Sequence, residues 1–496
     1  MFGSLRERVR QSQETCSGNG GLEGCCGYNQ AMRFPAPTLS LALLLCLTSG
    51  KTQAQTVPAP FPAPTQAAAP ALPSGLGAVT HTTLPNGLQV LAAPSAAADL
   101  VTVDVWVGAG TRRETMANEG AAHFIEHLIF KGTPTRSPGE IDAAIEDLGG
   151  SLNAATSYDW AHFYVTVGAS DAPAALGVLA DAVMHASLRQ ADMDTERNVI
   201  LSERARQLAS PAARTTEEVG ALLFPDHPYG RPLLGTLDSI NGMTRSSVLD
   251  FYKANYVPGN VTLVLSGNLT PQAAQDMAQK AFGAWQAAPV PADTLASAPA
   301  LAQTRAETLG GGQGQAYLTL GWQAPAVSDQ PDAWVMDVLL SYLGQAGGSK
   351  LDTDLRRRQK IVSAISASYL TQRDKGQMTI TASFDPTQTE PVRRAILADI
   401  AALRAVPLNA DEIGAARRSL LASYLFDAQT NSGRANALGF YNTINTYQYD
   451  TEYIAHVLSV TPAQVQAVAR KYLNPNVYAS VTLLPPTNPV LASARR

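Results

Sequence analysis

Alternating apolar and polar residues indicate strands near the start of the regular part of the chain. Residues 84–94 read LPNGLQVLAAP, and Asn86-Gly87 is a dipeptide typical of the tight turn between two strands. Residues 100–110 then alternate apolar and polar side chains with the period of two that a half-buried strand shows. We therefore predict a strand, a turn and further strands from about residue 80 onward.

Two helix–turn–strand segments, one in each half of the chain, are similar to each other. Residues 256–265 read YVPGNVTLVL and residues 472–481 read YLNPNVYASV, so Tyr, Asn and Val recur at the same spacing before an apolar strand. A threonine precedes each helix, Thr244 in the first half and Thr461 in the second. Chance similarity is the alternative, but the pattern favours an α+β fold made of two tandem homologous α/β sandwich-like units, a duplicated domain.

Stretches rich in proline and alanine divide the chain. Residues 55–77 are nearly uncharged and are interpreted as a tether, and residues 286–304 are interpreted as the interdomain linker. These boundaries assign residues 78–285 to the first unit and residues 305–490 to the second.

The segment 32–54 has the pattern of a secretory signal peptide. A basic start at Arg33 is followed by an apolar run at 39–47 and then by small residues. Residues 1–31 precede this complete signal and are interpreted as a non-native upstream extension. A retained anchor is the alternative, although the apolar run is short for a membrane span. We expect an exported protein, periplasmic or extracellular, with no transmembrane span after signal cleavage.

Composition narrows the function classes. Hydrophobic residues make up 45% and charged residues 16% of the 496 positions, as in a folded globular protein. The formal net charge of −5 gives no basic surface for nucleic acid, so no nucleic-acid partner is expected. All four cysteines, the last being Cys46, precede the first predicted unit, which excludes disulfides and a cysteine nucleophile from both units.

The segment His123-Phe-Ile-Glu126-His127 carries candidate metal chemistry. We predict that it lies on a helix starting at Asn118 as its N-cap and ending near Gly132. On a helix, His123 and His127 share a face and can offer two imidazoles to one Zn²⁺. Glu126 lies on the same side and can act as a general base toward water. A half-buried helix with two surface histidines is the alternative.

A catalytic zinc takes three protein ligands, so a third must come from elsewhere in the chain. Glu196 and Glu203 are seven positions apart and so lie on one stripe of a downstream helix. One of them can bind the metal while the other orients a ligand. A solvated helix face is the alternative, and spacing alone does not decide which glutamate binds.

These motifs resemble the pitrilysin, insulysin and mitochondrial processing peptidase family of zinc metallopeptidases with the inverted His-x-x-Glu-His motif, in its short two-domain bacterial type. Further similar segments are 84–90, 130–133, 153–159 and 227–236, and the similarity extends from about residue 80 to 485. The resemblance implies Glu203 as the third ligand and Glu196 as a supporting carboxylate in catalysis. It also implies a duplicated α+β domain that forms half of a clamshell.

The resemblance further implies how substrate is bound. The family's strand corresponding to Asn153-Ala154 pairs with extended peptide by β-augmentation, so these two residues are expected to bind substrate. A purely structural strand is the alternative. Family members also carry an Arg and, seven positions later, a Tyr that polarise the substrate carbonyl. Arg356 occupies the first position but Ser363 the second, and Tyr369 is too far along to replace it.

The sequence therefore predicts a zinc-dependent endopeptidase or oligopeptidase that hydrolyses extended peptides. Because Ser363 lacks a phenol, we expect a homodimer, or a heterodimer with a paralogue that supplies an Arg/Tyr pair. The alternative is a non-catalytic or partner-dependent scaffold subunit of a heterodimeric peptidase complex.

Overall fold

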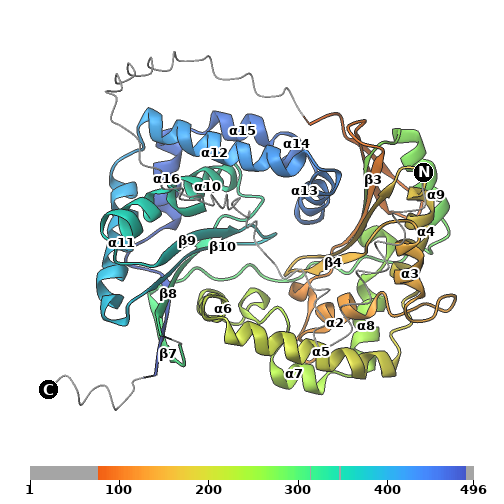
Figure 1. The fold of residues 1–496 in the computed structure, drawn as a ribbon, viewed down its shortest axis with the longest axis horizontal. Helices are drawn as coiled ribbons and strands as arrows, with labels where there is room; N and C mark the ends of the chain where they lie inside the picture. Colours follow the sequence, from red (N-terminus) through yellow and green to blue (C-terminus); the bar gives the residue numbers. More distant parts are fainter. Residues whose placement is uncertain (1–75, 313, 346–347, 487–496) are drawn as a thin grey trace, which may run out of the picture.

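The computed structural model describes residues 76–312, 314–345 and 348–486 (Figure 1). The predicted extension at 1–31, the signal peptide at 32–54 and nearly all of the tether at 55–77 lie outside these residues. Across the part that is described, no helix is both long and apolar enough to cross a membrane.

The first unit is built on a six-stranded sheet, here sheet A, with strand order β1-β2-β6-β3-β5-β4. The predicted turn at Asn86-Gly87 joins β1 to β2, and Gly87 adopts the positive φ of 95° that the turn requires. The strands are β1 (Thr80–Thr83), β2 (Gln89–Pro94), β3 (Leu100–Val107), β4 (Asn153–Thr156), β5 (Ala161–Gly168) and β6 (Val261–Gly267).

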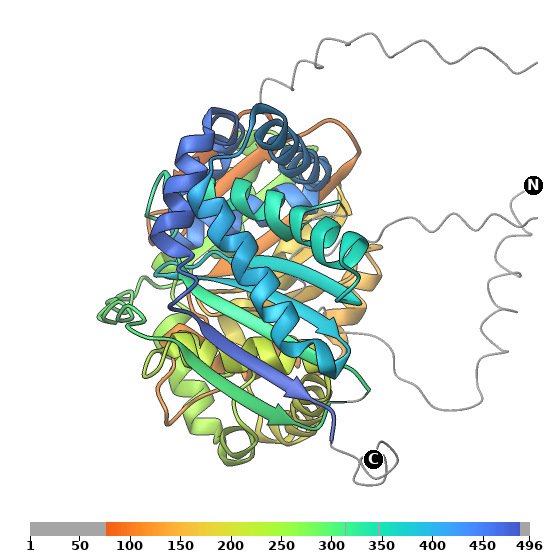
Figure 2. The same cartoon turned by 90° about the vertical axis from the view of Figure 1, so that its left-hand side faces the viewer.

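The second unit is built on a five-stranded sheet, sheet B, with strand order β7-β11-β8-β10-β9. Helices α10, α11 and α16 pack against its strands, and Figure 2 shows helices of this unit covering one face of the sheet. The strands are β7 (Arg305–Gly310), β8 (Ala316–Ala324), β9 (Ala364–Leu370), β10 (Gly376–Phe384) and β11 (Ala479–Leu484).

The two sheets share one topology. In each, the first core strand pairs in parallel with the last, as β2 does with β6 and β7 with β11. The remaining neighbours, β6-β3-β5-β4 and β11-β8-β10-β9, are all antiparallel. Thr244 and Thr461 cap corresponding helices, each accepting a hydrogen bond from the N–H three residues on. The predicted duplication of an α+β unit is therefore confirmed.

Helices surround both sheets. Those of the first unit are α2 (Ala121–Leu128), α3 (Glu140–Glu146), α4 (Ala172–His185), α5 (Gln190–Ala209), α6 (Pro211–Leu223), α7 (Leu237–Gly242), α8 (Arg245–Asn255) and α9 (Pro271–Phe282). Those of the second are α10 (Asp332–Leu340), α11 (Thr389–Ala405), α12 (Ala410–Ala428), α13 (Asn431–Ile444), α14 (Gln448–Thr451), α15 (Tyr453–Ser459) and α16 (Pro462–Tyr472). Two short helices of other types are the 3-10 helix η1 (Thr111–Arg113) and the π-helix η5 (Asp352–Arg358).

The units exchange one helix each across their boundary. Helix α6 of the first unit packs on β8 and β11 of sheet B, whereas α13 of the second unit packs on β3 and β6 of sheet A (Figure 1). Leu438 of α13 is fully buried in a cluster with Leu91, Trp106 and Val264 of sheet A. Each sheet thus completes its core with a helix from the other unit, which makes the two units interdependent.

The predicted linker contains neither helix nor strand and runs between α9 and β7. It is nevertheless held in place, because Asp293 pairs with Arg112 of the first unit at 2.7 Å. The Nζ of Lys375, in the second unit, donates to the carbonyl of Ala298 at 2.6 Å. The segment therefore contacts both units along its length.

Candidate active site

The helix that carries the motif is shorter than the sequence predicts. It begins at Ala121 with Gly120 as its N-cap at φ 97° and ends at Leu128, so the predicted cap at Asn118 and end near Gly132 are wrong. The Oδ1 of Asn118 instead accepts the N–H of Thr115 at 2.6 Å in a local turn. Such side chain–backbone bonds compete with helix capping, which explains the difference.

The start of α2 is capped by a residue that the sequence analysis missed. Both carboxylate oxygens of Glu114 accept backbone hydrogen bonds, from Gly120 N–H at 2.9 Å and Ala122 N–H at 2.8 Å. Glu114 is buried, and burial raises its pKa to about 8 although these N–H donors oppose the shift. A capping residue six positions upstream lies outside the usual N-cap patterns, so the sequence offered no signal for it.

Two histidines of α2 and one glutamate of α5 converge on a single point. The Nε2 atoms of His123 and His127 lie 3.7 Å and 3.5 Å from Oε2 of Glu203, and one ligand atom from each residue lies within 4.8 Å of the others. The imidazole rings are 4.7 Å apart at 70° to each other. The structure thus brings together the three residues expected to bind metal.

The geometry of these atoms fits a metal better than hydrogen bonding. Distances of 3.5–3.7 Å exceed those of ordinary hydrogen bonds, and Oε2 of Glu203 is buried with no hydrogen-bond partner among the residues that the structure describes. Two ligand atoms at about 2.0–2.1 Å from one tetrahedral Zn²⁺ lie roughly 3.4 Å from each other. A buried carboxylate oxygen without a partner is costly unless a cation binds it, so the donor set suits Zn²⁺.

Glu196 orients one of these histidines. Its Oε2 lies 2.9 Å from Nδ1 of His127, on the side of the ring away from Glu203, and its Oε1 pairs with Lys131 Nζ at 2.9 Å. A carboxylate in this position fixes the tautomer and orientation of a metal-binding imidazole. Helical spacing alone could not distinguish Glu196 from Glu203; the structure separates their places, and Lys131 had not been assigned a role.

The electrostatics of the cluster favour the forms that bind metal. Burial lowers the pKa of His123 and keeps it neutral, and the neighbouring carboxylates only partly oppose this. Burial alone would raise the pKa of Glu203, but His127 and His123 lower it below its ordinary value. Neutral imidazoles and an ionised carboxylate are the states in which these groups bind zinc.

Glu126 lies on the same helix but has no such partner. Its side chain is partly exposed, and within the described residues it forms no hydrogen bond or ion pair. Its negative charge is one of the effects that oppose the lowering of the His123 pKa by burial. A carboxylate beside the metal ligands, but not bound to a neighbour, remains available to accept a proton from water.

Strand β4 is one of the two edge strands of sheet A and contacts helix α2 (Figure 1). Successive residues of an antiparallel strand form backbone hydrogen bonds alternately with the strands on its two sides. The N–H of Ala169, just after β5, donates to Asp99 O beside β3, so the odd-numbered residues of β5 bond to β3. His162 and Tyr164, which are even-numbered, therefore bond to β4. Their partners Ala155 and Asn153 therefore face β5, whereas Ala154 directs its backbone N–H and C=O away from the sheet.

Arg356, which was expected to bind substrate, and Ser363, which stands where the family carries a tyrosine, form no contact with this cluster in the described part of the chain. Arg356, in η5, pairs with Asp352 and has a side chain 43% exposed, and within the described chain no contact joins it to His123, His127 or Glu203. The hydroxyl of Ser363 accepts a hydrogen bond from Gln315 at 2.9 Å. His162, which had no assigned role, is buried against Trp106 and bonded to Asp104 at 3.0 Å.

The chain is similar to known proteins over most of its described length. Residues 89–237 match the family model described as insulinase (peptidase family M16), and residues 242–420 match the one described as the peptidase M16 inactive domain. A Streptomyces coelicolor protein named an uncharacterized zinc protease is 30% identical over 405 residues, which cover 80% of this chain and 88% of that protein.

More distant relatives extend the similarity. An Arabidopsis thaliana protein named a probable mitochondrial-processing peptidase subunit beta is 28% identical over 405 residues, covering 79% of this chain and 76% of that protein. The crystal structure of a Helicobacter pylori protease superposes with a TM-score of 0.79 at 24% identity, covering 82% of this chain and all of the other, and supports the fold. The chain belongs to the insulinase family, peptidase family M16, and is a zinc metallopeptidase.

Proposed function

We propose that this metallopeptidase is an endopeptidase or oligopeptidase that hydrolyses peptides bound in extended form, with Glu126 as the general base. The observation that carries the proposal is the convergence of His123, His127 and Glu203 beside Glu126, whose carboxylate has no hydrogen-bond or ion-pair partner among the described residues. A structural metal site would need the three ligands but not the free carboxylate next to them.

The residues divide the chemistry among them. His123, His127 and Glu203 would hold Zn²⁺, which supplies Lewis acidity toward water and the scissile carbonyl. Glu126 accepts the proton of the attacking water and can return it to the leaving amine. Glu196 acts as a positioning residue, since it holds the ring of His127 through Nδ1.

Substrate binding is proposed at the free edge of β4. An extended peptide that pairs with the outward N–H and C=O of Ala154 would continue sheet A by one strand beside α2. Main-chain hydrogen bonds recognise extended backbone with little demand on side chains, which suits a peptidase of broad sequence tolerance. Asn153 faces β5 with its backbone, so its contribution would come from its exposed side chain.

A second chain is proposed to complete the site. Ser363 offers only a short hydroxyl where relatives are expected to carry a phenol, and Arg356 is engaged by Asp352. A heterodimer with a paralogue that brings an Arg/Tyr pair would supply the missing carbonyl donor, whereas a homodimer, in which both copies carry Ser363, would rely on Arg356 alone. The same observation favours a second candidate, a partner-dependent scaffold role on this fold.

Export is proposed on the signal-peptide pattern at residues 32–54. The mature protein would then act in the periplasm or outside the cell. Cell fractionation with N-terminal sequencing of the mature protein tests this, and a protein that keeps its N-terminus in the cytoplasm would refute it.

Metal analysis joined to peptide hydrolysis tests the catalytic proposal. The purified chain should contain about one zinc per chain and cleave a quenched peptide library, whereas Glu126→Gln should retain the zinc and lose at least about 10²-fold in kcat. A specific activity (rate per chain) that rises with protein concentration, together with a dimer in size-exclusion chromatography, would support a second chain. Full activity as a monomer would refute it, and a zinc-loaded chain that cleaves nothing at any concentration would favour the scaffold role.

A further inference from the structure

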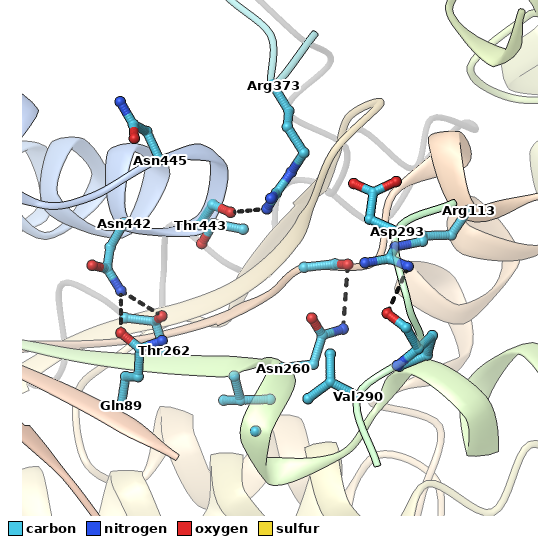
Figure 3. A pocket seen from close by; sticks show the side chains of 14 residues that line it. Gln89, Arg113, Asn260, Thr262, Val290, Asp293, Arg373, Asn442, Thr443 and Asn445 are labelled. Atoms are coloured by element: carbon cyan, nitrogen blue, oxygen red, sulfur yellow. Dashed lines mark hydrogen bonds between the residues drawn. The ribbon is translucent and has the colours of Figure 1, made fainter. Parts of the chain in front are cut away.

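A polar pocket with a volume of about 360 Å³ lies where both units and the linker meet. Figure 3 shows Arg113 entering it from the first unit and Arg373 from the second, with Asn442 and Asn445 of the α13 end opposite. No residue expected in catalysis or substrate binding lines it. The pocket is therefore separate from the zinc cluster.

Two guanidinium groups in this pocket have hydrogen-bonding capacity to spare. Arg113 Nη1 donates to the carbonyls of Pro291 at 3.0 Å and Ala292 at 3.2 Å, and Arg373 Nη2 donates to the carbonyl of Thr443. Neither arginine forms an ion pair within 4 Å in the described part of the chain. Since each guanidinium has five N–H donors, most of them remain available.

Two carboxylates and a helix end oppose the positive charge of this pocket, and each is already engaged. Asp293 lines the pocket, but its Oδ2 pairs with Arg112 Nη1 at 2.7 Å, outside the pocket lining. The C-terminal end of α13 brings partial negative charge, which Arg373 meets through the Thr443 carbonyl. Burial lowers the pKa of Arg113, and the charges of Arg112 and Arg373 lower it further, while Asp293 and Asp159 oppose this shift. Asp159 is itself engaged, since it accepts hydrogen bonds from the Tyr229 hydroxyl and from Arg373 N–H.

We propose that this pocket binds a small oxyanion, a phosphate or a carboxylate group, held between Arg113 and Arg373. Planar guanidinium donors match the paired oxygens of such groups, and an anion between two like charges removes their repulsion. The side-chain amide of Asn445, which has no hydrogen bond within the described residues, adds a further donor. Because the arginines come from different units, the anion bridges the two halves of the chain.

Calorimetric titration of the zinc-loaded full chain with inorganic phosphate and, separately, with malonate tests the proposal. At least one of the two should bind with a stoichiometry near one, and Arg113→Gln/Arg373→Gln should weaken that binding at least ten-fold. Binding of phosphate alone would assign a phosphate site, and binding of malonate alone a carboxylate site. Arg394→Gln/Arg418→Gln is the matched control, since it removes two exposed positive charges elsewhere and should leave binding unchanged.

The outcome is decided by the comparison of the two double variants. Equal weakening in both would show that net charge alone attracts the anion and would overturn the proposal, as would the absence of binding of either anion to the parent protein. If the pocket variant does not fold, the single variants Arg113→Lys and Arg373→Lys replace it. Each should bind more weakly than the parent protein because lysine lacks the paired donors; unchanged binding in both would overturn the proposal.

Discussion

Replacing Glu114 with glutamine tests whether a buried carboxyl group stabilises the start of α2, the helix that carries His123 and His127. Its two oxygens accept the N–H groups of Gly120 and Ala122 at 2.9 Å and 2.8 Å, and burial raises its pKa from an ordinary 4.5 to about 8. Glutamine has nearly the same shape and keeps one acceptor, but it cannot ionise. The substitution therefore separates the charge of the group from its size.

The sign of the pH effect follows from the two pKa values. The unfolded chain releases this proton near pH 4.5, whereas the folded chain keeps it until about pH 8. Glu114 therefore contributes its full stability below pH 4.5, and that contribution is lost as the pH rises toward 8. The slope is about 1.4 kcal/mol per pH unit, so between pH 5 and 8 the loss reaches up to about 4 kcal/mol.

Urea unfolding of the metal-free protein at pH 5, 6.5 and 8 measures this difference. The parent protein should lose stability relative to Glu114→Gln as the pH rises, and groups common to both proteins cancel in the comparison. Glu140→Gln serves as the control, because a hydrogen bond from Ser137 N–H lowers the pKa of the exposed Glu140. Its contribution is constant above pH 4.5, so its curve should stay parallel to that of the parent. Parallel curves for Glu114→Gln as well would refute the reasoning.

Three further substitutions probe the ligand geometry, the substrate edge and the junction of the units. Glu196→Gln should weaken zinc binding about 10- to 100-fold in a competition with a chelator, because His127 loses its carboxylate partner; unchanged affinity would contradict the assigned role. Ala154→Pro should raise KM for long peptides at unchanged zinc content, since only an N–H that points away from the sheet is lost. Ala155→Pro, the control, should destabilise sheet A because its N–H faces β5. Equal effects of the two substitutions on KM and on folding would count against β4 as the substrate edge. Arg112→Leu should cost about 3–5 kcal/mol in urea unfolding, because the buried carboxylate of Asp159 and the partly buried one of Asp374 lose their cation, and a loss below about 1 kcal/mol would contradict this.

Periodic patterns in the sequence were sufficient to predict the repeated architecture. Alternation over 100–110 and the Asn86-Gly87 turn predicted local structure that β1, β2 and β3 reproduce, and the threonines before α8 and α16 cap those helices as expected. These features depend on neighbours in the chain, so their signal is local. The two histidines of the motif likewise share a helical face through local geometry alone.

Features that depend on distant contacts could not be read in this way. The start of α2 is fixed by Glu114 rather than by the nearer Asn118, because a tertiary fold brings the carboxylate to the helix end. Helical spacing in α5 could not decide whether Glu196 or Glu203 is the metal ligand. Only their positions around His127 distinguish them, because Glu196 lies at Nδ1 and Glu203 at Nε2. The exchange of α6 and α13 between the units leaves no local signature, since both helices are amphipathic in the ordinary way.

The second unit supports the candidate metal site, although none of its described residues belongs to the cluster of His123, His127 and Glu203. The β4–β5 turn and the β9–β10 turn occupy equivalent places in the duplicated fold, and they meet where Arg373 N–H donates to Asp159 at 3.0 Å. Arg112 pairs with Asp374 of the second turn at 2.7 Å, and two residues after Arg112 the chain reaches Glu114, the cap of α2. A displacement of the second unit would therefore act on the helix that carries both histidines and Glu126, and on the turn that ends the β4 edge. This connection gives a physical reason why the second repeat is kept beside the one that carries the metal-binding cluster.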